Sequence, residues 1–208
     1  PEEVARLVLG KHRKRYLGQL IFSDIDLDQM DYLLRDAHFT GVALGMIDVD
    51  RLMGTLCVHR GRLAILSKGI EAVEGLLTAR SLMFTSVYFH HTVRAAEMML
   101  VNAVDSAISK VGPITKNNFY SMADAELMEH LYSLDGYPKD IALRLRYRQL
   151  FKTAYIEERR DLTHAEKQGY LRRFGRWCHT RGLQDEIADE AGVPHGQVIL
   201  DVPIVDII

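Results

Sequence analysis

Carboxylates crowd the stretch SDIDLDQMDYLLRDAHFTG, residues 23–41, where five aspartates fall within residues 24–36. Like charges at helical neighbour spacing destabilise a helix by roughly a few tenths of a kcal/mol per pair. A cation, or a ligand that brings one, offsets this repulsion, and carboxylate oxygens are good ligands for hard divalent cations. The stretch therefore predicts a site for a cation or a cation-bearing ligand.

A calcium-binding loop is the first interpretation to test, because Asp24, Asp26 and Asp28 alternate as loop positions 1, 3 and 5 would. Such a loop needs glycine at position 6 and glutamate at position 12. This sequence has Gln29 and Arg35 there. The calcium loop is therefore excluded.

A helix explains the stretch better, because its polar side chains recur at i, i+3, i+4, i+7 and i+8 and so share one face. These side chains are Asp28, Asp31, Tyr32, Arg35 and Asp36. The apolar positions between them, which are free to pack into a core, are Met30, Leu33, Leu34 and Ala37. A solvated surface with acids favoured by the helix dipole explains part of this pattern, but it leaves the tyrosine within the polar face unexplained.

The elements that position this face are expected to be mostly helical. We predict a helix over 2–22 that carries the basic cluster KHRKR, a helix from Leu27 that stops near Gly41, and a short helix over 48–56 capped by Asp48. A β-hairpin over 56–67 should turn at Arg60-Gly61, and a long helical stretch over 68–110 should be broken or bent before Gly112-Pro113.

Helices and strands are both predicted after Pro113. The predicted helices cover 123–134, 138–150, 163–177 and 183–192, and the predicted strands cover 151–158 and 197–208. The expected fold class is mainly α, with an HD-domain-like helical core over 1–112 and a smaller α+β lobe over 113–208.

The bulk properties exclude several classes of protein. The net charge of −2 argues against a protein whose main task is to coat nucleic acid. Cys57 and Cys178 have no neighbouring cysteine, which favours reduced thiols in a cytoplasmic protein over a disulfide framework or a cysteine-rich zinc site. Apolar runs of the length that a membrane helix needs are absent from the sequence.

The stretch IDLDQMDYLLRDAHFTG resembles the DxDxxDYxxRDxxxxG signature of HD-domain phosphohydrolases, specifically their deoxynucleoside triphosphate triphosphohydrolase branch. The downstream segments GMIDVDRLM and ARSLMFTSVYFHHTVRAAE resemble later elements of the same family, in the same order. The resemblance covers roughly residues 1–110 well and the rest more loosely.

The resemblance implies roles for particular residues. Members of this family hold a divalent metal through an H…HD…D pattern, and Asp28 matches its last aspartate. Tyr32 and Asp36 match residues that line the sugar pocket, Arg80 matches a phosphate-contacting arginine, and Tyr88 matches a sugar-contacting tyrosine. Asp31 and Arg35 are expected to form a supporting pair.

Gln29 stands where many relatives carry a cation aimed at the phosphates, and we expect it to contact substrate as a neutral donor. His-Asp dipeptides are absent from the 208 residues, and none of the nine histidines stands in an H…HD arrangement before Asp28. The H…HD segment, with the catalytic residues, is therefore expected upstream of Pro1. The adjacent pair His90-His91 is expected to serve in the core or to support the site from behind.

The expected function of the intact protein is metal-dependent hydrolysis of nucleotides, giving nucleoside and triphosphate from deoxynucleoside triphosphates. The alternatives are an HD hydrolase of another phosphate ester and a non-catalytic nucleotide-binding or oligomerisation module. The residues leave manganese, magnesium, iron and zinc open as the metal. A homo-oligomer is expected from the resemblance, without a membrane or nucleic-acid partner.

Overall fold

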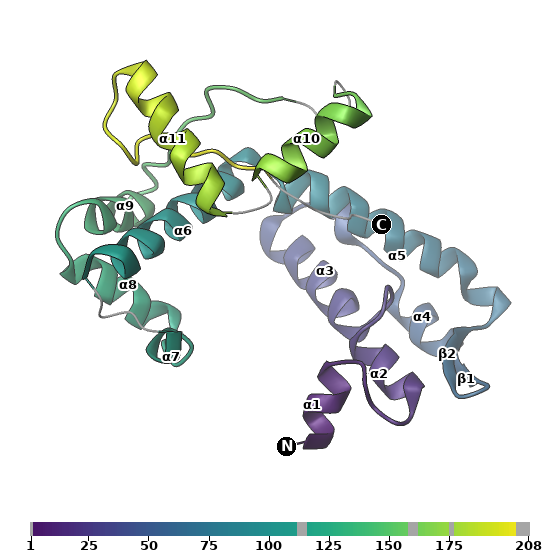
Figure 1. Cartoon of the computed structure of the whole chain (residues 1–208). Helices are drawn as coiled ribbons and strands as arrows, with labels where there is room; N and C mark the ends of the chain where they lie inside the picture. Colours follow the sequence, from purple (N-terminus) through teal and green to yellow (C-terminus); the bar gives the residue numbers. More distant parts are fainter. Residues whose placement is uncertain (1, 112–115, 158–161, 175–176, 203–208) are drawn as a thin grey trace. The chain divides into compact units, whose positions relative to one another are not determined.

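A computed structural model describes residues 2–111, 116–157, 162–174 and 177–202. The described residues divide into two compact units, the first ending at residue 88 and the second beginning at residue 89 (Figure 1). The domain boundary predicted near Gly112 lies outside the described residues.

The first unit begins with two short helices where one long helix was predicted. They are α1 (Glu2–Val8) and α2 (Arg15–Ile21). Gly10 interrupts the path between them with a φ of 66°, a left-handed backbone that glycine adopts without strain. The prediction of a single helix over 2–22 is therefore wrong, and the KHRKR cluster occupies the connecting segment and the start of α2.

The acid-rich stretch forms α3 (Leu27–Thr40), as predicted. The Asp26 carboxylate accepts a hydrogen bond from the backbone N–H of Gln29 at 2.8 Å and caps the first turn. Gly41, with a φ of 72°, ends the helix. The apolar face is buried at Met30, Leu33 and Ala37.

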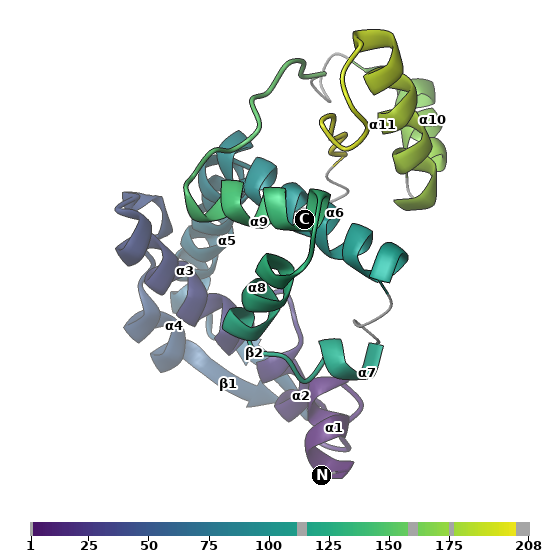
Figure 2. The same cartoon turned by 90° about the vertical axis from the view of Figure 1, so that its left-hand side faces the viewer.

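The short helix and the hairpin are also confirmed. They form α4 (Val49–Thr55), β1 (Leu56–His59) and β2 (Arg62–Ile65), shown in Figure 2. The Asp48 side chain caps α4 by accepting from the N–H of Arg51. The strands pair antiparallel, and Arg60 and Gly61 both have positive φ, as a tight two-residue turn requires.

The long helical stretch is broken, as predicted, and the break is a π-helix. A 3₁₀ turn over Ala43–Gly45 follows α3, and another over Ser67–Gly69 precedes α5 (Ile70–Met83). The π-helix η3 (Phe84–Tyr88) then ends the first unit. The core of this unit lies between α3, α4 and α5, and its buried side chains are Met30, Leu33, Ala37, Leu52, Ala72, Leu76 and Met83.

The second unit is helical in its described residues. It comprises α6 (His91–Val111), α7 (Lys116–Phe119), α8 (Asp124–Ser133), α9 (Tyr137–Arg146), α10 (His164–Phe174) and α11 (Trp177–Ala191). Its core forms where α8 and α9 pack on α6, around buried Met99, Leu131 and Ile141. Arg94 of α6 donates to both carboxylate oxygens of Asp201, at 2.8 and 2.6 Å, and so ties the end of the described chain to α6.

The two strands predicted for this part are wrong for residues 151–157 and 197–202, which are irregular. Side chains take the backbone donors that a sheet would have used. Met99 Sδ accepts from the N–H of Phe151 at 3.4 Å, and Gln184 Oε1 accepts from the N–H of Leu200 at 2.9 Å. The mainly helical fold class is confirmed. None of the described helices combines the length and the apolar character that crossing a membrane demands.

A glycine pair gives opposite stability predictions for the first unit. A Cβ on Gly45 would lie 2.6 Å from the backbone oxygen of Leu33, whereas a Cβ on Gly75, inside α5, would meet nothing within 4 Å. We expect Gly45→Ala to lower the free energy of unfolding by roughly 1–3 kcal/mol and Gly75→Ala to raise it by about 0.5–1 kcal/mol. Urea unfolding of both variants measures this, and a stable Gly45→Ala protein would contradict the tight packing of this turn.

A buried tyrosine makes the stability of the second unit fall at alkaline pH. The Tyr137 hydroxyl is buried and makes no hydrogen bond among the described residues, and burial raises its pKa to about 12. The unfolded chain, with a tyrosine pKa of about 10, loses this proton first, so stability should fall between about pH 10 and 12. We expect Tyr137→Phe to flatten this fall, measured by urea unfolding at pH 8, 10 and 11.

Candidate functional site

The polar face of α3 lies beside the end of α5 and the π-helix, all within the first unit. α3 and α5 pack on each other through buried side chains that include Leu33 and Leu76. Contacts join Tyr32, Asp36, Arg80 and Tyr88 across these elements. All six residues expected to bind metal or substrate lie on α3, α5 and η3. Four of them come from α3 (Asp28, Gln29, Tyr32 and Asp36), one from α5 (Arg80) and one from η3 (Tyr88).

A hydrogen bond joins the two sides of this site. The Tyr88 hydroxyl donates to Oδ2 of Asp36 at 2.7 Å. Burial is the largest cause of a strongly raised pKa at Tyr88, and the bond to the Asp36 carboxylate adds to it, because both favour the neutral phenol. Tyr88 is therefore a fixed donor, and it leaves the other carboxylate oxygen, Oδ1, for a different partner.

Aromatic rings lie on one side of Arg80. Its guanidinium lies over the ring of Phe84, with Cζ at 5.7 Å from the ring centroid. Phe84 meets Tyr88 edge-on at 5.0 Å, and Tyr88 meets Tyr32 edge-on at 6.1 Å. The Nε of Arg80 is buried and has no hydrogen-bond partner among the described residues. An anion that reached this guanidinium would satisfy a donor that the protein leaves open.

The pKa of the Tyr32 hydroxyl is shifted by neighbouring charges of both signs. Burial raises its pKa most, the neighbouring Arg80 opposes that rise as a charge and as a donor, and Asp26 and Asp28 add to it. Tyr32 is therefore close enough to Arg80, Asp26 and Asp28 for its pKa to respond to all three charges. It remains protonated at neutral pH.

The Gln29 side chain turns into the protein. It is 8% exposed, and its Nε2 donates to the backbone carbonyl of Ser23 at 3.3 Å. Its Oε1 is buried without a hydrogen-bond partner among the described residues. Its amide donor is thus used to hold the segment before α3, and the substrate contact expected for Gln29 stays a prediction.

Asp28 lies in the first turn of α3 and is exposed. Among the described residues, groups of three or more His, Cys, Asp or Glu side chains placed to hold a metal ion are absent. Asp28 is therefore one candidate ligand, and the described residues do not complete a metal site by themselves. Asp31, on the same face, forms an ion pair with Arg35, whose Nη2 lies 2.5 Å from Asp31 Oδ2. This is the pairing expected of the two residues.

Two features of the neighbourhood were missed or wrongly predicted. Sequence reasoning missed Ser23 as the anchor of Gln29, although the Asp26-x-x-Gln29 spacing is typical of a capped helix start. The core or supporting role expected for His90 or His91 is not observed, because both side chains are exposed. His90 instead accepts from the N–H of Thr92 at the start of α6.

Several known proteins are similar to this chain. An uncharacterized protein of Methanocaldococcus jannaschii is 37% identical over 167 residues, which cover 78% of this chain and 36% of that protein. A Dictyostelium discoideum protein named as a deoxynucleoside triphosphate triphosphohydrolase SAMHD1 homolog is 28% identical over 110 residues, covering 50% of this chain and 21% of the relative.

Two solved structures share the fold. A Bacteroides thetaiotaomicron phosphohydrolase aligns with a TM-score of 0.62 and 26% identity, over 92% of this chain and 52% of that one. A hypothetical protein from Aquifex aeolicus aligns with a TM-score of 0.67 and 32% identity, over 83% of this chain and 47% of that one. The chain thus spans about a third of its M. jannaschii relative and about half of these two structures.

The model of the HD associated region matches residues 47–207, most of the chain. The related sequences and structures agree with it on the wider superfamily. This chain belongs to the HD-associated region family of the HD superfamily.

Proposed function

We propose that this chain supplies the nucleotide-holding part of a metal-dependent phosphohydrolase site, and that the intact protein acts on deoxynucleoside triphosphates. One observation carries the proposal: an arginine with an unpartnered buried donor stands beside an aspartate–tyrosine pair, at the end of a helix face that begins with Asp28. Such a set offers separate partners to a phosphate, a sugar and a cation.

Arg80 is the phosphate-binding group in this proposal. A guanidinium carries a permanent charge and a fork of donors that suits phosphate oxygens. Phe84 supports the guanidinium from one side, which limits its motion and lowers the entropy lost when an anion binds. The open Nε supplies one of the donors.

Asp36, Tyr32 and Tyr88 form the sugar-binding side. Asp36 accepts from Tyr88 through Oδ2, so Oδ1 can accept from a sugar hydroxyl. The rings of Tyr32 and Tyr88 meet edge-on and offer apolar surface to the carbon atoms of a sugar. Both phenols keep their protons at neutral pH, because their pKa values are raised, and so add no negative charge near the phosphates.

Asp28 is proposed as the metal ligand of this chain, with the remaining ligands supplied by another part of the complete protein. A bound divalent ion would neutralise phosphate charge and make a water molecule more acidic. Exposure of Asp28 at the start of α3 leaves its carboxylate accessible for this role.

The names of two relatives support the chemistry. One is named for deoxynucleoside triphosphate triphosphohydrolase activity and one as a phosphohydrolase. Release of nucleoside and triphosphate requires the bond between the α-phosphorus and the 5′ oxygen to break. Water adds its oxygen to the phosphorus, and the 5′ oxygen takes up a proton. Arg80 stabilises the negative charge that grows on the phosphate oxygens.

A different phosphate ester is the second candidate substrate, and Gln29 favours it. A neutral amide that already donates to Ser23 adds no positive charge for a triphosphate. A monophosphate or a cyclic nucleotide carries less charge and needs less compensation. A non-catalytic nucleotide-binding or oligomerisation module remains the alternative from another class. The homo-oligomer and the cytoplasmic location also stay predictions.

Product analysis of the complete protein separates these functions. We expect deoxynucleoside triphosphate and added manganese to give nucleoside and triphosphate, resolved by ion-exchange chromatography. Release of orthophosphate, or turnover of monophosphates or cyclic nucleotides alone, would favour the second candidate. Nucleotide binding without turnover under any divalent metal would favour the non-catalytic module.

Replacing Asp28 tests its role as a ligand. We expect Asp28→Ala in the complete protein to lose bound metal and to lower turnover at least a hundredfold, with the fold retained because the side chain is exposed. Metal analysis by mass spectrometry and circular dichroism measure both effects. Asp24→Ala, another exposed aspartate four positions earlier, is the control and should keep its metal. Normal metal content in Asp28→Ala would remove Asp28 from the ligand set.

Removing one hydroxyl tests the sugar-binding side. We expect Tyr88→Phe to lower stability by about 0.5–1.5 kcal/mol, the usual net worth of one hydrogen bond. It should also raise KM for the nucleotide, because Asp36 loses the donor that fixes its orientation. Tyr120→Phe changes an exposed tyrosine and should alter neither quantity. An unchanged KM in Tyr88→Phe would show that this bond does not position the nucleotide.

A further inference from the structure

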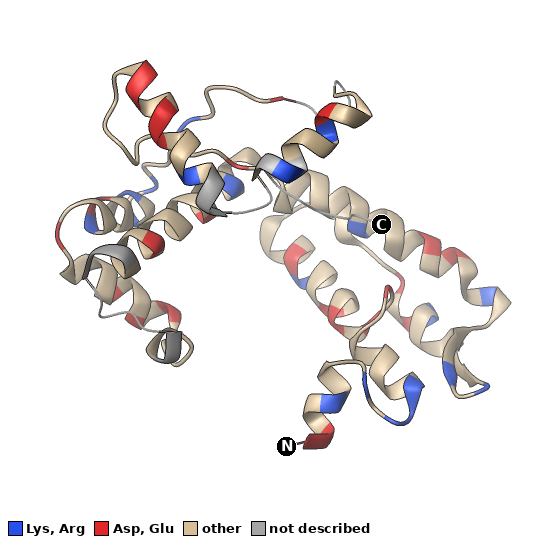
Figure 3. Ribbon diagram, in the orientation of Figure 1, with Lys and Arg blue, Asp and Glu red and all other residues tan. Residues whose placement is uncertain are grey.

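A second charged surface lies in the first unit, away from the residues assigned to the nucleotide. Lysine and arginine positions, blue on the ribbon of Figure 3, recur in the segment between α1 and α2 and on the hairpin. They also include the first residue of α2, and these positions are exposed. The basic patch is defined by six of them: Lys11, Arg13, Lys14, Arg15, Arg60 and Arg62.

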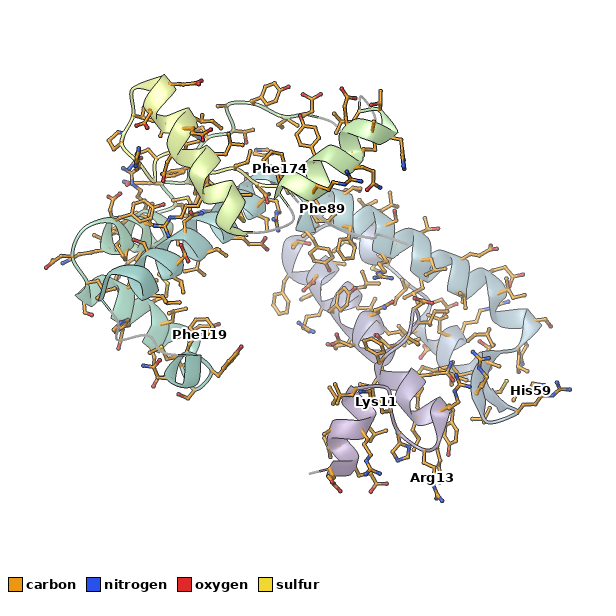
Figure 4. All side chains as sticks on the ribbon, in the orientation of Figure 1. Lys11, Arg13, His59, Phe89, Phe119 and Phe174 are labelled. Carbon is orange, nitrogen blue, oxygen red and sulfur yellow. The ribbon has the colours of Figure 1, made fainter. Side chains whose placement is uncertain are left out.

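The fold brings the two halves of the basic patch together. α2 packs on β2, and Gln19 Oε1 of α2 accepts from the N–H of Leu63 at 2.9 Å. Arg15 precedes Gln19 by one helical turn and so shares its face, and Arg62 is the neighbour of Leu63 in β2. In Figure 4 the side chains of Arg13 and His59 point outward from this part of the unit.

In the described part of the chain, the cations of the basic patch form no ion pair. Among the described residues, ion pairs link other cations to carboxylates, including His12 to Glu3 and Arg51 to Glu71, and none of these pairs uses a side chain of the basic patch. Glu3 is the acidic residue closest in sequence to the basic patch, and its carboxylate pairs with His12 and not with a cation of the patch. Six like charges on adjoining segments, none in an ion pair among the described residues, attract a polyanion.

An exposed aromatic side chain borders the basic patch. Phe22 follows the end of α2 and is 69% exposed. Its ring lies against Gly10, where a Cβ would come within 3.3 Å of Phe22 Cδ1, at the start of the basic connecting segment. A large apolar ring in solvent beside cations offers a base a stacking surface.

We propose that the basic patch with Phe22 binds single-stranded nucleic acid, with the cations on the phosphodiester backbone and Phe22 under a base. Single-stranded rather than duplex nucleic acid fits, because stacking on a side chain requires an unpaired base. The net charge of −2 hides this surface, since the acids that balance the total lie elsewhere, as on the exposed face of α3 at Asp28 and Asp31. The inference is independent of the phosphohydrolase site.

Charge reversal in both halves of the basic patch tests the electrostatic part. We expect Arg13→Glu/Arg62→Glu in the complete protein to weaken binding of a fluorescent 20-nucleotide single strand at least tenfold. The slope of log affinity against log salt should fall by about 1.4, since each lost phosphate contact on a single strand removes about 0.7. Lys152→Glu/Arg172→Glu makes the same change in net charge at exposed positions of the second unit and should leave affinity nearly unchanged.

An aromatic pair tests the stacking part. We expect Phe22→Ala to weaken single-strand binding about tenfold and Phe22→Trp to preserve it, because stacking is worth about 1–3 kcal/mol per base. Phe39→Ala removes a ring of α3 that is even more exposed, at 81%, and should have no effect. Circular dichroism of each variant checks that it is folded.

Three results would overturn the proposal. One is equal affinity for the single strand in the charge-reversed pair and in its control. Another is equal affinity for single strand and duplex in the unaltered protein together with no loss in Phe22→Ala. The third is binding of inorganic polyphosphate or anionic lipid vesicles in place of the oligonucleotide. Hydrolysis of nucleotides, measured in parallel, separates failure of this surface from failure of the phosphohydrolase site.

Discussion

The hydrogen bond between Tyr88 and Asp36 joins residues 52 positions apart and holds the candidate site together. The π-helix makes this contact possible. An α-helical turn takes about 3.6 residues, so a step of four residues rotates slightly more than one full turn. Side chains spaced by four therefore shift gradually around the helix axis. A π turn is wider, and the same step falls short of a full turn. The step from Phe84 to Tyr88 therefore cancels the drift from Arg80 to Phe84. Arg80 and Tyr88 thus both reach α3, at Tyr32 and Asp36.

Local rules predicted the elements that surround the site. Asp26, Gly41 and Asp48 mark helix ends through interactions within a few residues, and Arg60-Gly61 forms its turn through its own backbone. The predictions that were wrong concern segments whose hydrogen-bond partners lie far away in the sequence. The N–H of Phe151 is satisfied by Met99, and that of Leu200 by Gln184, so residues with strand-like composition form no strand there. The pairing of Asp36 with Tyr88 was likewise not evident from spacing, although both residues were assigned to one pocket.

Two unpartnered buried atoms give the site a stability cost in the described chain. Arg80 Nε and Gln29 Oε1 both lack hydrogen bonds among the described residues, and a buried polar atom without a partner costs about 1–3 kcal/mol. A ligand that satisfies one of them regains part of that free energy on binding. The open donor at Arg80 suits an anion, whereas the open acceptor at Gln29 belongs to a side chain that turns into the protein.

The arrangement of charge explains why anion binding and cation binding belong together at this site. Asp26 and Asp28 oppose Arg80 at the Tyr32 hydroxyl, because the two aspartates raise its pKa and the arginine lowers it. A triphosphate at Arg80 would meet one fixed positive charge and several negative ones, and a single guanidinium cannot offset them. A divalent cation held at Asp28 reverses the sign of the interaction between the helix and the phosphates. Under the proposed function, the acidic face of α3 would repel a bare polyphosphate and accept one accompanied by metal. The proposed role of the basic patch needs no metal, because none of its cations forms an ion pair in the described part of the chain.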